Sequence, residues 1–319
     1  MTHSTLRAAV IGVGYLGRFH AQKYAQLPGV KLVGIADSDR STASAVAAEL
    51  GVPAIADYRE LLGNVDAISI AVPTPLHFEI ACEFLQRGVH VLVEKPITTT
   101  VEQAEQLIHL AQVKRCVLQV GHLERFNPAI LAISDRLKAP RFVESHRLAP
   151  FKQRGTDVSV VLDLMIHDID LIQELVQAPI ESIDAVGAAI FSNDLDIVNA
   201  RIRFQNGCVA NTTASRVSLK QERKIRIFQD DAYMSLDLQQ KIVTTIRKKS
   251  AAPVESPAQV AIEEQSFDQG DALKAEIEAF LNSVRNNTAP VVSGEDGLRA
   301  LKTALRIAEL IRSNAQPQT

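Results

Sequence analysis

The chain has 319 residues, of which 46% are hydrophobic and 22% are charged, which is the balance of a globular protein long enough for two domains. The net charge of -3 excludes a global basic field of the kind that binds nucleic acid. No apolar run approaches the ~20 residues of a membrane helix, and the N-terminal "MTHSTLRAAVIG" lacks the long apolar region of a signal peptide. We therefore expect a cytoplasmic protein. The three cysteines are far apart, so we expect neither a disulfide framework nor a metal site.

Strand and helix patterns alternate along the first third of the chain. Short apolar runs predict strands at 7–14, 30–37, 66–72, 90–96 and 116–122. Helical spacing predicts helices at 15–27, 41–51, 75–88 and 101–115, with a serine as the N-cap and a glycine at the end of the second. Apolar strands that alternate with helices indicate a parallel sheet covered on both faces. Residues 1–122 are therefore predicted to form a doubly wound, Rossmann-type α/β domain.

The pattern changes after residue 122. Strand candidates follow one another without helices between them, at 181–191, 197–207, 208–217 and 224–238. Helices are predicted at 128–137, 161–176, 271–286 and 295–313, and a polar loop at 249–269. Residues 123–319 are thus predicted to form an α+β domain with a mostly antiparallel, open sheet. The C-terminal helices can pack back toward the first domain.

The stretch "GVGYLG" follows the first predicted strand and opens a helix, which is the context that a dinucleotide-binding glycine loop requires. An acid follows at the end of the next strand and can accept hydrogen bonds from a ribose. It would repel a 2'-phosphate, so NAD is favoured over NADP. The cofactor contacts predicted here are Gly12, Gly14, Tyr15, Leu16, Gly17, Asp37 and Ser38.

Two more strands end at the same predicted edge, where ligands bind in such sheets. "AVPTPLH" places Pro73, Thr74 and His77 there, although His77 is equally explained as a polar residue in the first turn of a helix. "VLVEKPI" ends a buried strand on Glu94 and Lys95, beside a proline that restricts the backbone. A lysine near a nicotinamide can polarise a substrate hydroxyl.

The helix "DLMIHDIDLIQE" carries Asp163, His167, Asp170 and Glu174 at helical spacing, so they form one polar stripe. From spacing alone, the favoured interpretation is the wet face of an amphipathic helix. The alternative is that Asp163 and His167 face a cleft, where an imidazole is the usual general base near neutral pH.

"GVGYLG", "EKP" and "DLMIHDID", in this order, resemble the Gfo/Idh/MocA oxidoreductases over essentially the whole chain. The resemblance implies a Rossmann domain, a second domain with an open sheet, and a bound NAD or NADP. It matches Lys95 to the family's catalytic lysine, and Asp163 and His167 to its acid–histidine pair. It leaves open whether Lys95 or His167 is the base. Many members carry glycines before the catalytic acid, where this chain has "TDVSVVLD".

The segment "VGHLERFNPAI" (120–130) resembles the family's nucleotide-sugar 3-dehydrogenases, which oxidise the 3-hydroxyl of UDP-N-acetylglucosamine or of its uronic acid. Their 3-keto product typically passes to an aminotransferase. A UDP-sugar also brings a pyrophosphate that needs cations. The predicted substrate contacts are Arg125, Asn127, Arg147, Arg154, Asp163 and His167.

The sequence thus predicts an NAD-dependent oxidation at C3 of a UDP-hexosamine. One alternative is a dehydrogenase of another sugar or a polyol such as inositol, and another is a non-catalytic NAD-binding sensor. Family members usually assemble through the outer face of the second domain's sheet, so we expect a homodimer or homotetramer. In "VNARIRFQ", apolar side chains alternate with arginines, which predicts one face covered by helices.

Overall fold

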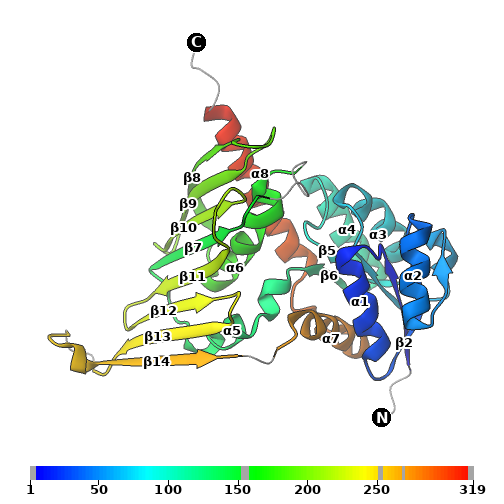
Figure 1. Ribbon diagram of the computed structural model, residues 1–319, viewed down its shortest axis with the longest axis horizontal. Coiled ribbons are helices and arrows are strands. Elements are labelled where there is room, and N and C mark those ends of the chain that lie inside the picture. Colours follow the sequence, from blue (N-terminus) through cyan, green and yellow to red (C-terminus); the bar gives the residue numbers. More distant parts are fainter. Residues whose placement is uncertain (1–4, 152–157, 251–253, 268–269, 315–319) are drawn as a thin grey trace. The chain divides into compact units, whose positions relative to one another are not determined.

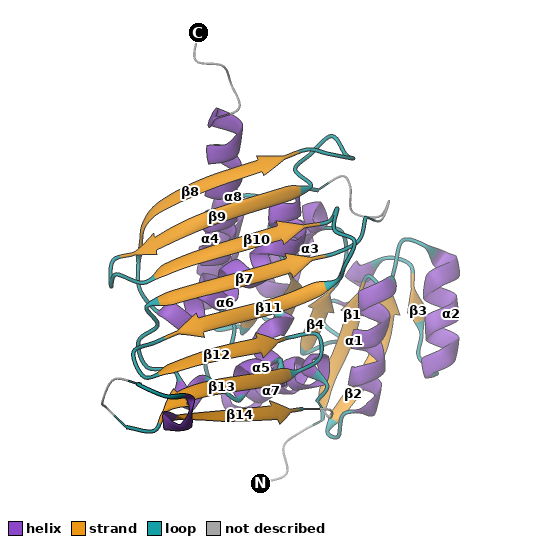
Figure 2. Cartoon of the chain, turned by 60° about the vertical axis from the view of Figure 1, so that its left-hand side comes forward, coloured by secondary structure: helices purple, strands orange, loops and turns teal. Residues whose placement is uncertain are grey.

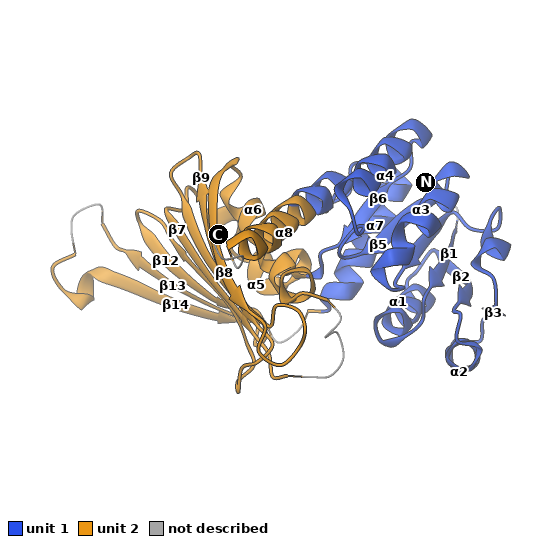
Figure 3. Cartoon of the chain, turned by 90° about the horizontal axis from the view of Figure 1, so that it is seen from above, with its two compact units in different colours: residues 1–123, 271–299 blue, residues 124–270, 300–319 orange. Residues whose placement is uncertain are grey.

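The computed structural model describes residues 5–151, 158–250, 254–267 and 270–314 of the chain (Figure 1). The chain divides into two compact units, coloured separately in Figure 3. Unit 1 comprises residues 1–123 and 271–299, and unit 2 comprises residues 124–270 and 300–319. The sequence placed one boundary after residue 122. In the structure a second crossing returns residues 271–299 to unit 1.

Unit 1 is built on a six-stranded parallel sheet with the strand order β3-β2-β1-β4-β5-β6. This is the order of a dinucleotide-binding doubly wound fold, so the predicted fold class is confirmed. Its strands are β1 (Leu6–Ile11), β2 (Val30–Ala36), β3 (Ala54–Ile55), β4 (Ala67–Ile70), β5 (His90–Glu94) and β6 (Leu118–Gly121). Its helices are α1 (Tyr15–Gln26), α2 (Arg40–Leu50), α3 (His77–Gln86), α4 (Val101–Lys114) and α7 (Ala272–Asn286).

Helix α2 shows how local chemistry sets the ends of an element. The sequence predicted a serine N-cap, but the helix begins one residue earlier, at Arg40. The carboxylate of Asp39 accepts hydrogen bonds from the main-chain N–H groups of Ser41 and Thr42. Gly51 caps the C-terminal end of the helix, and its φ of +68° is the left-handed conformation that glycine adopts without strain.

Unit 2 is built on an eight-stranded sheet with the order β14-β13-β12-β11-β7-β10-β9-β8. Only β7 and β10 run parallel among these neighbours, so the mostly antiparallel prediction is confirmed. Its strands are β7 (Phe142–Leu148), β8 (Ile180–Ala188), β9 (Ile197–Phe204), β10 (Val209–Ser215), β11 (Glu222–Phe228), β12 (Ala232–Asp237), β13 (Ile242–Lys248) and β14 (Val260–Ser266).

Helices α5 (Pro128–Leu131) and α6 (Ile166–Val176) belong to unit 2, and α8 (Gly294–Asn314) runs from unit 1 into it. The alternation predicted in β9 is present: Val198, Ala200, Ile202 and Phe204 are buried, in one core with residues of α6 and the end of α8. Figure 2 shows the opposite face of the sheet, where no described helix lies in front of the strands.

Three predictions in this unit were wrong. The helix predicted at 128–137 is only α5 followed by a 3-10 turn at Ser134–Arg136. The loop predicted at 249–269 contains β14, an edge strand whose side chains are mostly exposed and so lack an apolar alternation. The strand predicted at 224–238 is two strands, β11 and β12, that pair with each other. Within the described residues, no helix is both long and apolar enough to cross a membrane.

Candidate active site

The glycine loop between β1 and α1 shows why two of its glycines are required. Gly12 has a φ of +81°, and a Cβ there would lie 2.6 Å from the main-chain oxygen of Ala71, just beyond β4. A Cβ at Gly17 would lie 1.8 Å from the main-chain oxygen of Gly12. Helix α1 can therefore pack this closely on the loop only because no side chain intervenes.

The third glycine of the loop fits a bound dinucleotide. A Cβ at Gly14 would meet no described atom within 4 Å, so the fold leaves the space beside it open. Gly14 is the N-cap of α1, where no side chain among the described residues makes a cap and no acid lies in the first turn. Such a helix N-terminus suits a pyrophosphate, because its N–H groups and dipole favour negative charge. Tyr15 and Leu16 open the helix, exposed and half-buried respectively.

Asp37 follows β2 and is tied to the glycine loop. Its Oδ2 accepts a hydrogen bond of 2.7 Å from the main-chain N–H of Val13, and its Oδ1 accepts one of 2.9 Å from that of Asp39. An ionised carboxylate has about four acceptor sites, so both oxygens can still accept hydrogen bonds from ribose hydroxyls. Ser38, the next residue, is exposed.

His77 is buried, and its ring connects two loops of unit 1 by hydrogen bonds. Its Nδ1 lies 2.9 Å from the main-chain oxygen of Pro96, and its Nε2 lies 2.9 Å from that of Val72. Burial lowers the pKa of His77, and a neutral imidazole has one N–H to donate to these two oxygens. His77 therefore links the end of β4 to the segment after β5. Pro73 is exposed and Thr74 half-buried at the start of the same turn.

Glu94 and Lys95 stand at the carboxyl end of β5, as predicted, and both are half-buried. The Oε2 of Glu94 lies 3.4 Å from the main-chain nitrogen of Lys95, which donates to it. The Oε1 of Glu94 lies 3.1 Å from Nε2 of His20, a buried residue of α1. The Lys95–Pro96 peptide bond is cis.

Asp163 and His167 lie at the start of the main helix of unit 2. The predicted helix 161–176 is a π-helical turn at Val161–Met165 that continues as α6. Asp163 sits within this turn and His167 in the first turn of α6, and both are half-buried. Single π-helical turns are rare and occur often at functional sites. The sequence missed this turn because its residues also fit a regular helix.

Arg125 holds the second half of the polar stripe on α6. Its Nε and Nη2 each lie 2.7 Å from an oxygen of Asp170, which is a bidentate pair, and its Nη1 lies 2.7 Å from Oε2 of Glu174. Arg125 and Asp170 are 6% and 2% exposed. Asp170, at least, is therefore not part of a wet helix face. A guanidinium that forms a bidentate pair with buried Asp170 and also contacts half-exposed Glu174 orients α6.

A second buried arginine joins α6 to the segment before α5. Nη2 of Arg147 lies 2.8 Å from Oδ1 of Asp168, and its Nη1 lies 3.0 Å from Oε1 of Glu124. Burial raises the pKa of Asp168 despite this partner. For Glu124, burial is outweighed by the charge of Arg147, which lowers its pKa. Asn127 donates to Oε2 of Glu124 and accepts from the main-chain N–H of Ala129, so it caps α5.

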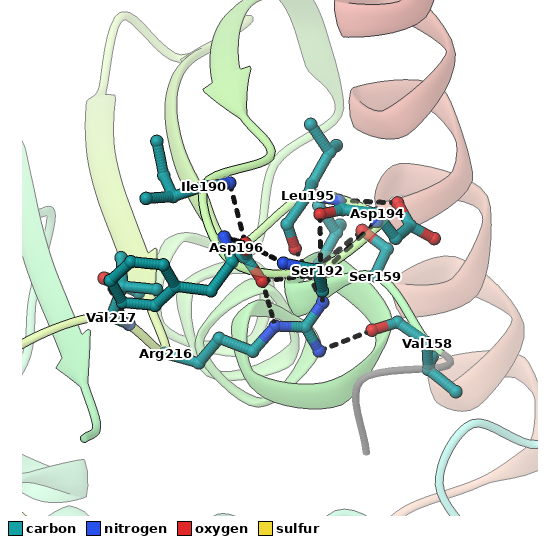
Figure 4. A network of polar contacts seen from close by, with 12 residues as sticks. Val158, Ser159, Ile190, Ser192, Asp194, Leu195, Asp196, Arg216 and Val217 are labelled. Carbon is teal, nitrogen blue, oxygen red and sulfur yellow. Dashed lines mark hydrogen bonds and ion pairs between the residues drawn. The ribbon is translucent and has the colours of Figure 1, made fainter. Parts of the chain in front are cut away.

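Arg216 closes a third network, around the loop between β8 and β9 (Figure 4). Its Nε donates to Oδ1 of buried Asp196 at 2.8 Å, and its Nη1 donates to the main-chain oxygen of Val158. Asp196 also accepts hydrogen bonds from the main-chain N–H groups of residues 190, 191 and 192. This arginine is a structural link within unit 2.

The structure thus brings the predicted residues together in separate groups. The glycine loop and Asp37 form one group, and Asp163, His167 and the stripe on α6 form another. Arg154 lies outside the described residues. The buried groups that the sequence analysis did not single out include Glu124, Asp168 and Glu276. The signal for Glu276 was present, because it occupies the apolar stripe of α7 with Leu273, Ile277 and Phe280.

Comparison with known families accounts for these features. Residues 6–122 match the model described as "Oxidoreductase family, NAD-binding Rossmann fold", and residues 135–235 match the "GFO/IDH/MocA C-terminal domain". The chain belongs to the GFO/IDH/MocA oxidoreductase family. It is therefore an oxidoreductase with an NAD-binding domain. The open space beside Gly14 fits the binding of that dinucleotide.

Several family members resemble the chain from end to end. It is 41% identical over 312 residues to the UDP-N-acetylglucosamine 3-dehydrogenase of Acidithiobacillus ferrooxidans, covering 98% of this chain and 99% of the relative. A solved structure of that enzyme superposes with a TM-score of 0.91 and covers 97% of this chain and 98% of the other. The NAD-dependent scyllo-inositol 2-dehydrogenase of Bacillus subtilis is more distant, at 26% identity over 98% of this chain and 96% of the relative.

Proposed function

We propose that the protein oxidises the 3-hydroxyl of UDP-N-acetylglucosamine to a 3-keto sugar with NAD. The observation that carries this proposal is the 41% identity, along nearly the full length of both chains, to a dehydrogenase with that activity. The segment 120–130 supports it through its resemblance to the family's nucleotide-sugar 3-dehydrogenases, and its residues Glu124, Arg125 and Asn127 belong to buried networks.

The proposed cofactor contacts are the glycine loop, Asp37 and the ends of β4 and β5. NAD, when bound, supplies the acceptor for the hydride that leaves C3 of the sugar. The open space at Gly14 and the uncapped start of α1 would take the pyrophosphate. Asp37 would accept hydrogen bonds from the ribose and disfavour a 2'-phosphate.

The proposed chemistry at the hydroxyl uses three side chains. His167 takes the hydroxyl proton, since a neutral imidazole is the usual base near neutral pH. Lys95 donates a hydrogen bond to the same oxygen and stabilises its developing negative charge. Asp163 positions the histidine. The π-helical turn that carries Asp163 and the arginine pairs of α6 hold Asp163 and His167 in place.

The buried arginines change the proposal for the pyrophosphate of the substrate. Arg125 and Arg147 donate to carboxylates of their own unit, so we assign them to orienting α6. Arg223 is more accessible, with a side chain that is 45% exposed and lies 3.6 Å from Glu124. Together with Arg154 it is the better candidate for a substrate cation.

The proposal extends to the setting of the reaction. A cytoplasmic location, assembly as a homodimer or homotetramer, and transfer of the 3-keto product to an aminotransferase are its further parts. The open face of the eight-stranded sheet is the proposed self-association surface. Analytical ultracentrifugation of the purified chain tests the assembly.

The experiment that tests the function measures NADH formation with purified protein. UDP-N-acetylglucosamine is compared with UDP-glucose, with the uronic acid form and with myo-inositol, with a coupled aminotransferase to draw off product. His167→Ala and Lys95→Met are expected to lower kcat by about 10²–10⁴-fold. The controls are His146→Ala, on β7, and Lys114→Met, on the exposed end of α4.

The outcomes separate the candidates. Turnover of the N-acetylated nucleotide sugar alone supports the proposal. Turnover of inositol alone would keep the family and replace the substrate. NAD binding without turnover of any compound would favour a non-catalytic sensor. A loss of the acidic limb of the pH–rate profile in His167→Ala would assign the base to His167, and its retention would assign it to Lys95.

A further inference from the structure

Glu276 is an acid buried in the core of unit 1. It lies on α7, and its exposed fraction is 0%. Neither of its carboxylate oxygens has a hydrogen-bond partner among the described residues. Its helix neighbours Leu273, Ile277 and Phe280 pack in the same apolar core. An ionised carboxylate is strongly disfavoured in such surroundings unless a cation compensates it.

Two titratable groups close to the Glu276 carboxyl come from two other elements. One ligand atom each of Glu276, of His20 on α1 and of Glu94 on β5 lie within 4.8 Å of one another. Burial, and then the charge of Glu94, raise the pKa of Glu276 well above its usual value. Two carboxylates this close are not both ionised without a compensating charge. Gly121 makes room for the pair, because a Cβ there would lie 2.9 Å from the Glu94 carboxylate.

A chain of hydrogen bonds runs beside Glu276, from Tyr24 through Ser69 and His20 to Glu94. The hydroxyl of Tyr24 lies 2.9 Å from Oγ of Ser69, which lies 3.2 Å from Nδ1 of His20. Nε2 of His20 lies 3.1 Å from Oε1 of Glu94. If each group donates to the next, from Tyr24 to Glu94, every donor is satisfied with His20 neutral. Burial raises the pKa of Tyr24, which keeps it a donor.

Two cationic side chains near the ends of α7 have partners other than Glu276. Lys23, on α1, pairs with Asp271 at the N-cap of α7. Arg285, in the last turn, donates to the main-chain oxygens of residues 28 and 29. On β6, the amide of Gln119 donates to the main-chain oxygen of Glu276 and not to its side chain. The strand is followed by His122, a buried titratable group.

We propose that Glu276 is a neutral carboxylic acid at neutral pH beside the carboxylate of Glu94. The pair then carries one negative charge, which sits on Glu94 between His20 and the main-chain nitrogen of Lys95. Glu276 is thereby a positioning residue for Lys95, and this part of the inference rests on the proposed function. Loss of the proton would place a second negative charge in the same buried pocket.

Infrared spectroscopy tests the proton directly. The full-length protein at neutral pH is expected to show the C=O stretching band of a protonated carboxylic acid, which shifts in D2O. Glu276→Gln removes this band. Glu278→Gln, on the partly exposed side of the same helix, keeps it. Absence of the band in wild type, or its survival in Glu276→Gln, would overturn the proposal.

Thermal stability gives a second test with a definite sign. A group whose pKa is raised in the folded state binds its proton more tightly there than when unfolded. Wild-type stability is therefore lost as pH rises from about 4.5 through the folded pKa. Glutamine mimics the protonated acid. The Tm of Glu276→Gln is therefore expected to equal that of wild type near pH 4.5 and to exceed it at higher pH.

A lower Tm of Glu276→Gln at neutral pH would show that the carboxylate is ionised and compensated. Elemental analysis identifies one such compensation, because histidine and two carboxylates are ligands for a divalent cation. A stoichiometric metal in the purified protein would overturn the proposal.

The positioning role has its own readout. Glu276→Gln is expected to keep its kcat to higher pH than wild type, because the second charge does not form. Identical pH profiles would contradict this role. The infrared band and the Tm do not depend on a substrate. If no sugar nucleotide is turned over while the band is present, only the proposed function fails.

Discussion

The buried acids of the two units have different neighbours. In unit 2, Asp170 and Asp168 each contact a buried arginine, and Asp196 contacts Arg216. In unit 1, both oxygens of Glu276 are without a hydrogen-bond partner among the described residues, and its near neighbour is another acid. A guanidinium partner favours the ionised form of a buried carboxylate, whereas a second carboxylate beside it favours the protonated form. Removing a charge from a buried ion pair of unit 2 is therefore expected to lower the stability of the protein. Removing the carboxyl group of Glu276 in unit 1 is expected to raise it at neutral pH.

The largest effect is expected from removing a buried arginine. Arg147→Ala leaves Asp168 without its arginine and Glu124 with only the half-exposed Arg223, and we expect a loss of about 3–5 kcal/mol in the free energy of unfolding. Urea denaturation measures it. The control is Arg226→Ala, whose side chain is 38% exposed and pairs with Glu144, with an expected loss of about 0–1 kcal/mol.

Equal losses in these two variants would contradict the assignment of Arg147 to the fold. A raised KM for the sugar nucleotide without any loss of stability would instead make Arg147 a substrate ligand, as the sequence predicted.

A smaller effect separates two glycines of the cofactor loop. Gly17→Ala places a methyl group against the main chain at Gly12, and we expect a loss of about 1–3 kcal/mol in stability. Gly14→Ala meets no described atom, so its stability should change by less than about 1 kcal/mol while its affinity for NAD falls. Thermal unfolding and NADH fluorescence titration measure the two. Unchanged NAD affinity in Gly14→Ala would show that the open space is not a cofactor contact.

The smallest expected effect is the loss of stability at acidic pH that depends on Asp196 in unit 2. Burial tends to raise the pKa of Asp196, but hydrogen bonds from Ser192, from main-chain N–H groups and from Arg216 lower it well below its usual value. Its contribution to stability is present above the unfolded pKa of about 3.8 and is lost as pH falls toward the folded pKa. Asp196→Asn is expected to remove this acid-side slope, opposite in sign to the slope that Glu276→Gln removes. Parallel stability curves for Asp196→Asn and wild type below pH 4 would contradict it.

The fold of unit 1 could be predicted closely because its signals are local. Apolar strands of a covered parallel sheet are continuous in sequence, and glycines mark the loop after β1. Unit 2 was predicted less completely. Its edge strand β14 has mostly exposed side chains, and the end of the predicted helix at 128–137 has no regular helix in the structure. The residues of β14 have the sequence pattern of a polar loop, and residues 128–137 have that of an amphipathic helix, so neither difference could be seen in the sequence.

The positions of the candidate residues at strand ends could be predicted from the sequence, whereas their contacts within the protein could not. Gly12, Asp37 and Lys95 lie at strand ends where the sequence placed them. Arg125 and Arg147 were expected to meet a substrate, and they donate to Asp170 and Asp168. An arginine in a sequence has no mark that tells a ligand contact from a buried ion pair, because its partner is distant in the chain.

By itself, the sequence determined the two sheet classes, the glycine loop and the acid after β2, because periodicity and turn chemistry act over a few residues. Only the tertiary structure decided which polar groups are buried and with what partner. Glu276 and Glu94 meet because α7 returns to unit 1 after the whole of the second sheet, and Arg125 meets Asp170 because α6 packs beside it. The charge state of a buried group depends on such neighbours, and these neighbours come from folding rather than from adjacency in the chain.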